Sequence, residues 1–441
     1  MKSKSMKFVW RIVVSSALAT ACVANAQTNP LPRWGDRIDM DGLVDPTGQL
    51  LARDGSVLAD QSGEPLRPAC AMSAVIPEPF RFFVQAGRSD RVLIYHDGGG
   101  ACWESNTCAT PLVSNNPIYD TRITEDEYNL AYAGGVLDRA NAANPFKDWT
   151  KVFIPYCTGD VGWGNRDVAY QIGPNQLLPI RHRGYANIRA VLRWLEDYYR
   201  DHKLPPPAKV ALTGSSAGAY ATIGTVFPEA IKVLPPTTDT YVIADSGNGI
   251  ITDSFLASAK ANWGYESTLP NYLVPVVAGG AEGLPVRFFG ELTRRFRGTR
   301  FGQFQNAYDS IQTLVLNTMK YTDDPGRWTD LHDLAGSLVE WTLKARLATN
   351  LSAFAPNYRF YTSSGSEHAI LVNIPPEANA GFCSDNFYTE NSAAGLSFRN
   401  WTNAMVNGGG HLWNTGNWRN ATCFPNCIAP AGPGCLPLVQ P

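Results

Sequence analysis

The chain has 441 residues, of which 44% are apolar and 17% charged, so it can bury a large hydrophobic core. Its formal net charge is −2, which leaves no excess of basic residues to displace the counterions of a polynucleotide. These figures indicate a globular protein and argue against a nucleic-acid partner.

The first 26 residues have the pattern of a secretion signal. Basic residues between positions 2 and 11 precede a short apolar run, and "ANA" before Gln27 is a typical cleavage site. We expect cleavage near Ala26 and export to the periplasm or the medium. Cys22 leaves a lipoprotein as an alternative, although Ala19 stands where a lipobox has Leu. No later run reaches the ~18 apolar residues of a membrane span, so we expect none.

Eight cysteines follow the leader, at positions 70, 102, 108, 157, 383, 423, 427 and 435. In an oxidising compartment this even number predicts four disulfides. Cys102 and Cys108 are close enough for a local bridge, and we expect the group at 423, 427 and 435 to tie the C-terminal tail to the body. Free buried thiols are the alternative. A metal site is not expected, because no C-x-x-C pair or His-rich stretch accompanies the cysteines.

Residues 27–75 are rich in Gly, Asp and Pro and lack clear periodicity, so an irregular N-terminal extension is predicted. Strands are predicted at 80–85, 91–97, 151–157, 209–214, 239–247 and 357–365. Helices are predicted at 185–201, 217–234, 304–320 and 329–347.

Apolar strands that alternate with helices indicate an α/β fold, a mostly parallel α/β-hydrolase-like sheet with helices on both faces. No internal repeat is evident. We expect one domain over residues 76–441 with long insertions, the largest from about 252 to 356.

The stretch "KVALTGSSAGAYATIG", residues 209–224, places two serines and two glycines between a predicted strand and a predicted helix. Residues 214–218 fit G-x-S-x-G, in which a sharp strand-to-helix turn exposes a nucleophilic serine and excludes neighbouring side chains. We predict Ser216 as the nucleophile and the Ala217 amide as an oxyanion donor. A small-residue turn without catalysis is the alternative.

A second glycine-rich segment, "IYHDGGGACW", follows the predicted strand 91–97. Its backbone can approach an acyl carbonyl closely, so the amides of Gly99 and Gly100 are predicted to complete the oxyanion hole. A plain tight turn is the alternative.

A serine nucleophile needs a base, and the chain has six histidines. The chain order Ser, acid, His of hydrolases with this turn leaves His332, His368 and His411. His368, in "SSGSEHAIL", follows the last predicted strand and is preferred over His411, in "GGGHLW". His332 is expected to be solvated.

Spacing does not identify the acid. Asp245, in "ADSGNG", and Asp309, in "FQNAYDSIQ", could both lie at the carboxyl edge of the sheet. Asp323, Asp324 and Glu367 are weaker candidates.

Six motifs in this order, "YHDGGGACWESNTC", "YCTGDVGWGN", "LTGSSAGAYAT", "ADSGNG", "AYDSIQT" and "SEHAIL", resemble the pectin acetylesterase and Notum family of secreted carboxylesterases over roughly residues 75–410. The resemblance implies a Ser216, Asp309 and His368 triad, with an oxyanion hole from the glycine block and the residue after the serine.

The resemblance also implies positions near the pocket for Asp245 and Trp163, and Asp160 in the same loop is a further candidate. Two departures would reshape that pocket. The tryptophan that often follows the glycines is displaced to Trp103, and Gly162 stands where a histidine is common.

We expect a secreted monomeric serine esterase without a cofactor, which removes a small acyl group, acetyl first, from a pectin-like polysaccharide. The alternatives are an esterase for longer acyl chains or for other esters, and an inactive binding protein that keeps the fold.

Overall fold

The computed structural model describes residues 35–76, 78–114, 118–123, 134–372, 386–408 and 416–427. The expected signal peptide, His411, Cys383 and Cys435 lie outside these residues. The span Trp34–Pro441 groups into one compact unit.

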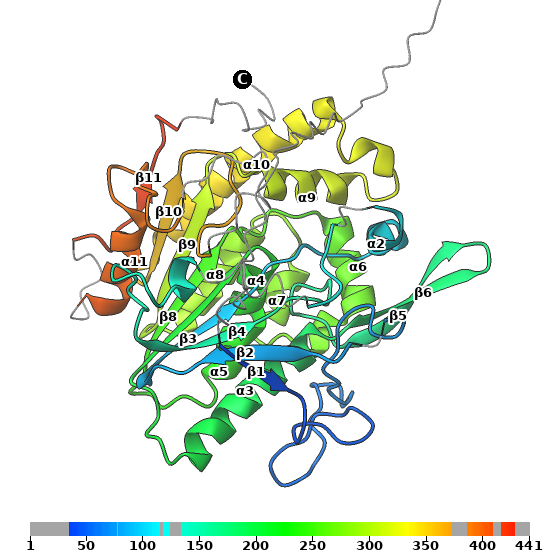
Figure 1. The fold of residues 1–441 in the computed structure, drawn as a ribbon. Helices are drawn as coiled ribbons and strands as arrows, with labels where there is room; N and C mark the ends of the chain where they lie inside the picture. Colours follow the sequence, from blue (N-terminus) through cyan, green and yellow to red (C-terminus); the bar gives the residue numbers. More distant parts are fainter. Residues whose placement is uncertain are drawn as a thin grey trace, which may run out of the picture. The chain divides into compact units, whose positions relative to one another are not determined.

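A central sheet in the described residues has nine strands in the order β1-β2-β4-β3-β7-β8-β9-β10-β11 (Figure 1). Its strands are β1 (Asp36–Asp39), β2 (Arg81–Gln85), β3 (Arg88–His96), β4 (Trp149–Ile154), β7 (Lys209–Ser215), β8 (Asp239–Asp245), β9 (Arg300–Asn306), β10 (Tyr358–Ser363) and β11 (Ala421–Thr422). Every neighbouring pair from β4 to β11 is parallel, and the pairs β1–β2 and β2–β4 are antiparallel. The expected mostly parallel sheet of an α/β-hydrolase fold is confirmed.

The helices follow or connect these strands. They are α1 (Ser105–Cys108), α2 (Thr110–Val113), α3 (Gly184–Asp201), α4 (Ala217–Ala221), α5 (Phe227–Ala230), α6 (Asp253–Trp263), α7 (Val274–Ala278), α8 (Leu284–Arg295), α9 (Ser310–Lys320), α10 (Leu331–Ser352) and α11 (Phe398–Asn407). A π-helical segment, Thr222–Val226, joins α4 to α5, so the helix predicted at 217–234 consists of three pieces. No helix in the described ranges is both long enough and apolar enough to cross a lipid bilayer.

The register of the central strands brings the candidate site residues to one edge of the sheet. Gly214 at the end of β7 pairs with His96 at the end of β3, and Ser215 pairs with Asp245 at the end of β8. Strands β7 and β8 are buried along almost their whole length, as expected for strands covered on both faces. Loops that leave the carboxyl ends of adjacent parallel strands therefore meet above β7.

The segment 252–356, expected to be an insertion, contributes β9 to the sheet, where it lies between β8 and β10. The prediction that a helix begins at residue 304 was wrong, because β9 runs to Asn306 and α9 begins at Ser310. The strand was missed because its buried positions include Gln303 and Gln305, whose polarity breaks the apolar pattern. Their side chains bond to Asn248, which makes this burial tolerable.

The N-terminal extension, expected over residues 27–75, packs against the main body. Strand β1 pairs with β2 at the edge of the sheet, and a disulfide joins Cys70 to Cys157, which follows β4. Between β1 and Cys70, the chain forms successive tight turns with isolated β-bridges, including one between Val44 and Leu50.

A hairpin outside the central sheet and the C-terminal tail complete the described structure. Strands β5 (Arg166–Gly173) and β6 (Gln176–His182) form a separate antiparallel hairpin that the sequence analysis did not predict (Figure 1). In the tail, Cys423 bonds to Cys427, so this bridge is local, and the pairing of β11 with β10 attaches the tail to the body.

Candidate active site

Ser216 lies at the turn between β7 and α4, with φ 55° and ψ −123°, a conformation that residues with a side chain rarely adopt. Its backbone amide donates to the carbonyl of Asp245 at 2.8 Å, which ties the turn to the end of β8. A hydrogen bond thus stabilises the strained residue.

The two glycines of the motif are required by close packing. A methyl group on Gly214 would collide with the carbonyl of Gly218, and one on Gly218 would collide with the carbonyls of His96 and Asp97. The turn therefore packs directly on the end of β3, and this contact fixes the height of Ser216 above the sheet.

The glycine-rich loop lies against this turn. A Cβ on Gly98 would lie 2.9 Å from the carbonyl oxygen of Ser215 and 3.0 Å from the Cβ of Ser216. Gly99 and Gly100 have φ values of 154° and 69°, which favour glycine. Ala217 is the first residue of α4, so its amide has no carbonyl partner within that helix. Three residues were predicted to supply amide donors. Gly100 and Ala217 line a cavity together with Ser216, whereas Gly99 is not part of its lining.

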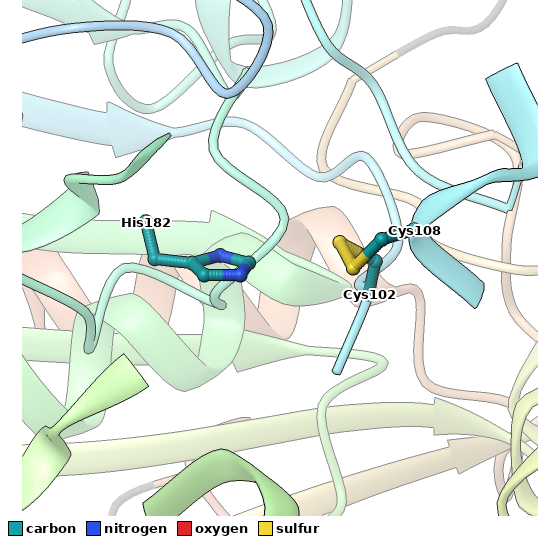
Figure 2. Close-up of side chains that lie close together, drawn as sticks. All are labelled: Cys102, Cys108 and His182. Carbon is teal, nitrogen blue, oxygen red and sulfur yellow. A yellow bond between two sulfur atoms is a disulfide. The ribbon is translucent and has the colours of Figure 1, made fainter. Parts of the chain in front are cut away.

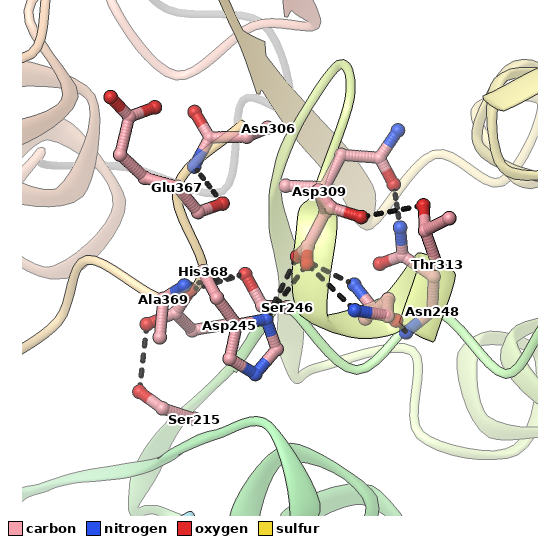
Figure 3. A network of polar contacts seen from close by, with 12 residues as sticks. Ser215, Asp245, Ser246, Asn248, Asn306, Asp309, Thr313, Glu367, His368 and Ala369 are labelled. Atoms are coloured by element: carbon pink, nitrogen blue, oxygen red, sulfur yellow. Dashed lines mark hydrogen bonds and ion pairs between the residues drawn. The ribbon is translucent and has the colours of Figure 1, made fainter. Parts of the chain in front are cut away.

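His368 and Asp309 lie together (Figure 3). The Nδ1 atom of His368 is 2.9 Å from Oδ2 and 3.0 Å from Oδ1 of Asp309, whose side chain is fully buried. Burial alone lowers the pKa of His368, but the charge and hydrogen bond of Asp309 and the charge of Asp245 raise it, and the net shift is upward. The opposite ring atom, Nε2, has no hydrogen-bond partner among the described residues.

His368 and Ser216 both line one cavity of about 70 Å³. No hydrogen bond between Nε2 and Ser216 is formed in the described structure. Such bonds are often long in free hydrolases and shorten when substrate excludes water. The arrangement therefore places a hydroxyl, a buried imidazole and backbone amides around one space.

The cavity wall is mainly apolar and comes largely from segments that the sequence analysis did not assign to the site. These segments are the loop after β8 and helices α6, α8 and α9, which supply Ile250, Phe255, Leu284, Phe288, Val315 and Met319. The apolar periodicity of residues 284–292 could have suggested a buried helix, but not that its buried face borders Ser216.

The other candidate pocket residues differ in position. Trp163 lines the cavity. Its ring stacks on that of Phe288 with 6.1 Å between the ring centroids, and its Nε1 donates to the carbonyl of Tyr220. Trp103 lies outside the lining and packs edge-on against Phe255 at 5.0 Å, so it supports the wall from behind.

Asp160 and Asp245, expected near the pocket, are fully buried and are not among the residues that line the cavity. Asp160 accepts hydrogen bonds from Thr158, Gly162 and Gly184, and burial raises its pKa to about 6. It holds the backbone of the loop that carries Trp163. Asp245 bonds to Ser215 and to the backbone that follows His368.

Of the other histidines, His332 is exposed in the first turn of α10, and His96 is buried with its Nδ1 bonded to a backbone carbonyl. Burial lowers the pKa of His96 to about 4. Among described residues, His368 is therefore the histidine that shares a cavity with Ser216.

One set of side chains resembles a metal site in composition. Cys102, Cys108 and His182 bring their ligand atoms within 4.8 Å of one another (Figure 2). However, the two sulfur atoms are joined in the disulfide that the sequence analysis predicted, and a disulfide offers no thiolate ligand. The ring of His182 forms hydrogen bonds with the carbonyl of Thr158 and the hydroxyl of Tyr170. The Cys102–Cys108 disulfide closes the loop that follows the glycine block, so the cluster is structural.

Comparison with known proteins gives a consistent result. The family model described as pectinacetylesterase matches residues 80–344, more than half of the chain. A curated relative, the palmitoleoyl-protein carboxylesterase NOTUM of Schmidtea mediterranea, is 26% identical over 136 residues, which are 31% of this chain and 23% of that protein. The match thus spans about a quarter of the relative's length.

Two crystal forms of the Wnt deacylase Notum from Drosophila are similar in structure. One has a TM-score of 0.52 at 15% identity and covers 83% of this chain and 95% of its own. The other has a TM-score of 0.49 at 18% identity, with coverages of 75% and 88%. At these identities the first likeness supports the fold alone.

Proposed function

Because the chain belongs to the pectinacetylesterase family, whose members are carboxylic ester hydrolases, we propose that it cleaves esters through an acyl-enzyme on Ser216. His368 is the general base and acid, and Asp309 orients it. The observation that carries this proposal is the shared cavity of Ser216 and His368, with one imidazole nitrogen held by Asp309 and the other unbonded within the described structure.

In the first half of the reaction, Oγ of Ser216 attacks the ester carbonyl while its proton passes to Nε2 of His368. The negative charge on the carbonyl oxygen is stabilised by the amides of Ala217 and Gly100, which line the cavity. When the tetrahedral intermediate collapses, the ester bond breaks and Nε2 returns the proton to the departing alcohol.

In the second half, water attacks the acyl-serine and gives a proton to Nε2. Collapse releases the carboxylic acid and restores the Ser216 hydroxyl. Asp309 keeps the Nδ1 proton in place and stabilises the imidazolium that forms twice in each cycle.

The cavity favours a short to medium acyl chain. The cavity volume of about 70 Å³ is the space open to the centres of water-sized groups, each of which needs about 10 to 15 Å³. The cavity therefore holds roughly five to seven such groups. Its wall of Ile, Phe, Leu, Val and Met side chains stabilises methylene groups at about 0.8 kcal/mol each. Acyl groups of about four to six carbons fill this space, whereas acetyl leaves much of it empty.

Removal of acetyl from a pectin-like polysaccharide is the second candidate, and the description of the matching family favours it. Export of the protein fits both candidates. Three disulfides in the described residues suit an oxidising compartment, as the sequence of residues 1–26 leads us to propose.

Rates on p-nitrophenyl acetate, butyrate, hexanoate, octanoate and palmitate test the proposal, together with acetate release from acetylated pectin and xylan. We expect kcat/KM to peak at butyrate or hexanoate and to vanish in Ser216→Ala. The exposed His332→Ala is the matched control and should keep wild-type rates.

Each other outcome has a clear meaning. A peak at acetate with release from pectin would replace the acyl-chain proposal by polysaccharide deacetylation. Equal hydrolysis by the wild type and Ser216→Ala would remove Ser216 as the nucleophile, and no hydrolysis by the wild type would favour a binding protein on this fold.

A further inference from the structure

Asp245 and its neighbour Ser246 lie between the two loops that carry the nucleophile and the base (Figure 3). Oδ2 of Asp245 accepts from Oγ of Ser215 at 2.7 Å, and Ser215 directly precedes the nucleophile. The same oxygen accepts from the amides of Ile370 at 2.8 Å and Leu371 at 2.9 Å, just after His368.

Ser246 strengthens the connection from the other side. Its Oγ accepts from the amide of Ala369 at 3.0 Å and donates to Oδ1 of Asp245 at 3.2 Å. Three successive amides after His368 are thus bound by two adjacent residues at the end of β8. The backbone of Asp245 also accepts from the amide of Ser216 at 2.8 Å.

We infer that Asp245 and Ser246 are positioning residues that hold the histidine loop in register with the nucleophile turn, an inference that rests on the proposed function. The two residues form what we call the β8 clasp. They bond to residues before and after the reacting side chains and accept no hydrogen bond from His368 itself, which Asp309 holds.

Backbone geometry explains why such a clasp is needed. Ser216, Ser246 and Ala369 have φ values of 55°, 55° and 65°, in the left-handed region that residues with a Cβ adopt only at a cost in free energy. Each of these strained residues makes at least one of the clasp's hydrogen bonds. The loops hold these conformations because the bonds offset that cost.

A carboxylate suits this position because its two oxygens only accept hydrogen bonds and together offer about four acceptor sites, which match the donors Ser215, Ser246, Ile370 and Leu371. Asp245 is fully buried, and burial raises its pKa, while the bonds from Ile370, Leu371 and Ser215 oppose that rise. Its charge interacts with His368 and with Tyr95 on β3. The clasp therefore supplies geometry and also part of the field that favours the imidazolium.

Two substitutions separate these contributions. Asp245→Asn can keep an acceptor oxygen for Ser215 and the loop amides and turn its new amide towards Ser246, so geometry is retained and charge lost. Asp245→Ala loses every side-chain bond. Asp239→Asn, exposed at the opposite end of the same strand, is the matched control.

On the best p-nitrophenyl ester, we expect Asp245→Ala to lower kcat by about 100-fold with little change in KM, as a misplacement of about 1 Å does. Asp245→Asn should keep more of kcat and move the acid limb of the kcat/KM profile to lower pH, because His368 loses one charge that raises its pKa. Ser246→Ala should lower kcat less than Asp245→Ala.

The inference is overturned if Asp245→Asn and Asp245→Ala, with wild-type melting temperatures, keep the wild-type kcat and the wild-type acid limb. It is also overturned if Asp245→Ala unfolds and Asp245→Asn, which remains folded, leaves the acid limb in place. Lack of esterase activity in the wild type would contradict the proposed function instead, so the two failures are distinguishable.

Discussion

The carboxylate of Asp309 contacts His368 and caps a helix at the same time. Its Oδ1 accepts from the backbone amide of Gln312 at 2.9 Å in the first turn of α9, and both of its oxygens lie within 3.0 Å of Nδ1 of His368. The rigid start of α9 thus fixes the direction from which the imidazole is held.

Replacement of Asp309 by Asn should affect rate and pH dependence together. The wrong imidazole tautomer is favoured, so kcat should fall by roughly 10⁴-fold, as for the equivalent aspartate of serine proteases. Since Asp309 raises the pKa of His368, the residual activity should have an acid limb at lower pH. A pH profile of kcat/KM checks this, and an unshifted limb would contradict the assigned partnership.

The second prediction concerns the packing of the nucleophile turn. Gly218→Ala places a methyl group against the carbonyls of His96 and Asp97, so we expect a loss of about 1 to 3 kcal/mol in the free energy of unfolding and a fall in kcat. Gly290→Ala is the control, since Gly290 lies in α8 with open space at its Cβ and should gain about 0.5 to 1 kcal/mol. Urea denaturation measures both, and equal effects would contradict the close approach.

Much of this site follows from the sequence because its motifs are local. The G-x-S-x-G turn and the glycine block each need only a strand, a few small residues and a helix or loop, all adjacent in the chain. The choice between Asp245 and Asp309 did not follow from spacing, because Asp245 ends β8 and Asp309 follows β9, and these adjacent parallel strands end at the same edge of the sheet. The family resemblance implied Asp309, and the contacts distinguish the two residues: Asp309 bonds to His368, and Asp245 bonds to the backbone after it.

The remaining differences have a common physical origin in long-range pairing. Strand β9 is polar in sequence, and its Gln303 and Gln305 are buried because residues more than 50 positions away supply their partners. These partners are Asn248 for both, Tyr358 for Gln303 and Thr362 for Gln305. Strand β1 is only four residues long and exists through its pairing with β2. Neither interaction produces a local periodicity that a reader of the sequence could detect.

Asp160 should make the folded protein more stable as the pH falls from 6 to 4, whereas most paired carboxylates make it less stable. Its pKa rises from 3.8 to about 6 in the folded state through burial, so the folded protein binds one more proton than the unfolded chain between these values. The contribution of this proton to the free energy of unfolding is present in full below pH 3.8 and is lost as the pH rises through about 6. It amounts to about 3 kcal/mol.

Asp160→Asn lacks this titration. The stability of the wild type minus that of the variant should therefore decrease by about 2 kcal/mol between pH 4 and pH 6, which is the larger part of the full contribution. Urea denaturation at several pH values measures the difference. A difference that grows with pH would show that the hydrogen bonds to Asp160 outweigh its burial.

The disulfides should differ in their effect on stability. Cys70–Cys157 closes a span of 87 residues and Cys102–Cys108 one of 6, so loop closure predicts losses of about 4 to 5 and about 2 kcal/mol when each pair is replaced by serine. The first replacement should also loosen the N-terminal extension and expose it to protease. Equal losses in the free energy of unfolding for the two replacements would contradict the view that both disulfides stabilise the protein by loop closure.

The nucleophile is the central claim, and a covalent probe tests it most directly. The purified protein is treated with a fluorophosphonate, digested, and mapped by mass spectrometry, with Ser216→Ala and Ser215→Ala treated in parallel. We predict one adduct on Ser216, absent from Ser216→Ala and present in Ser215→Ala. Labelling of another residue, or a wild-type protein that hydrolyses esters without being labelled at Ser216, would contradict the account.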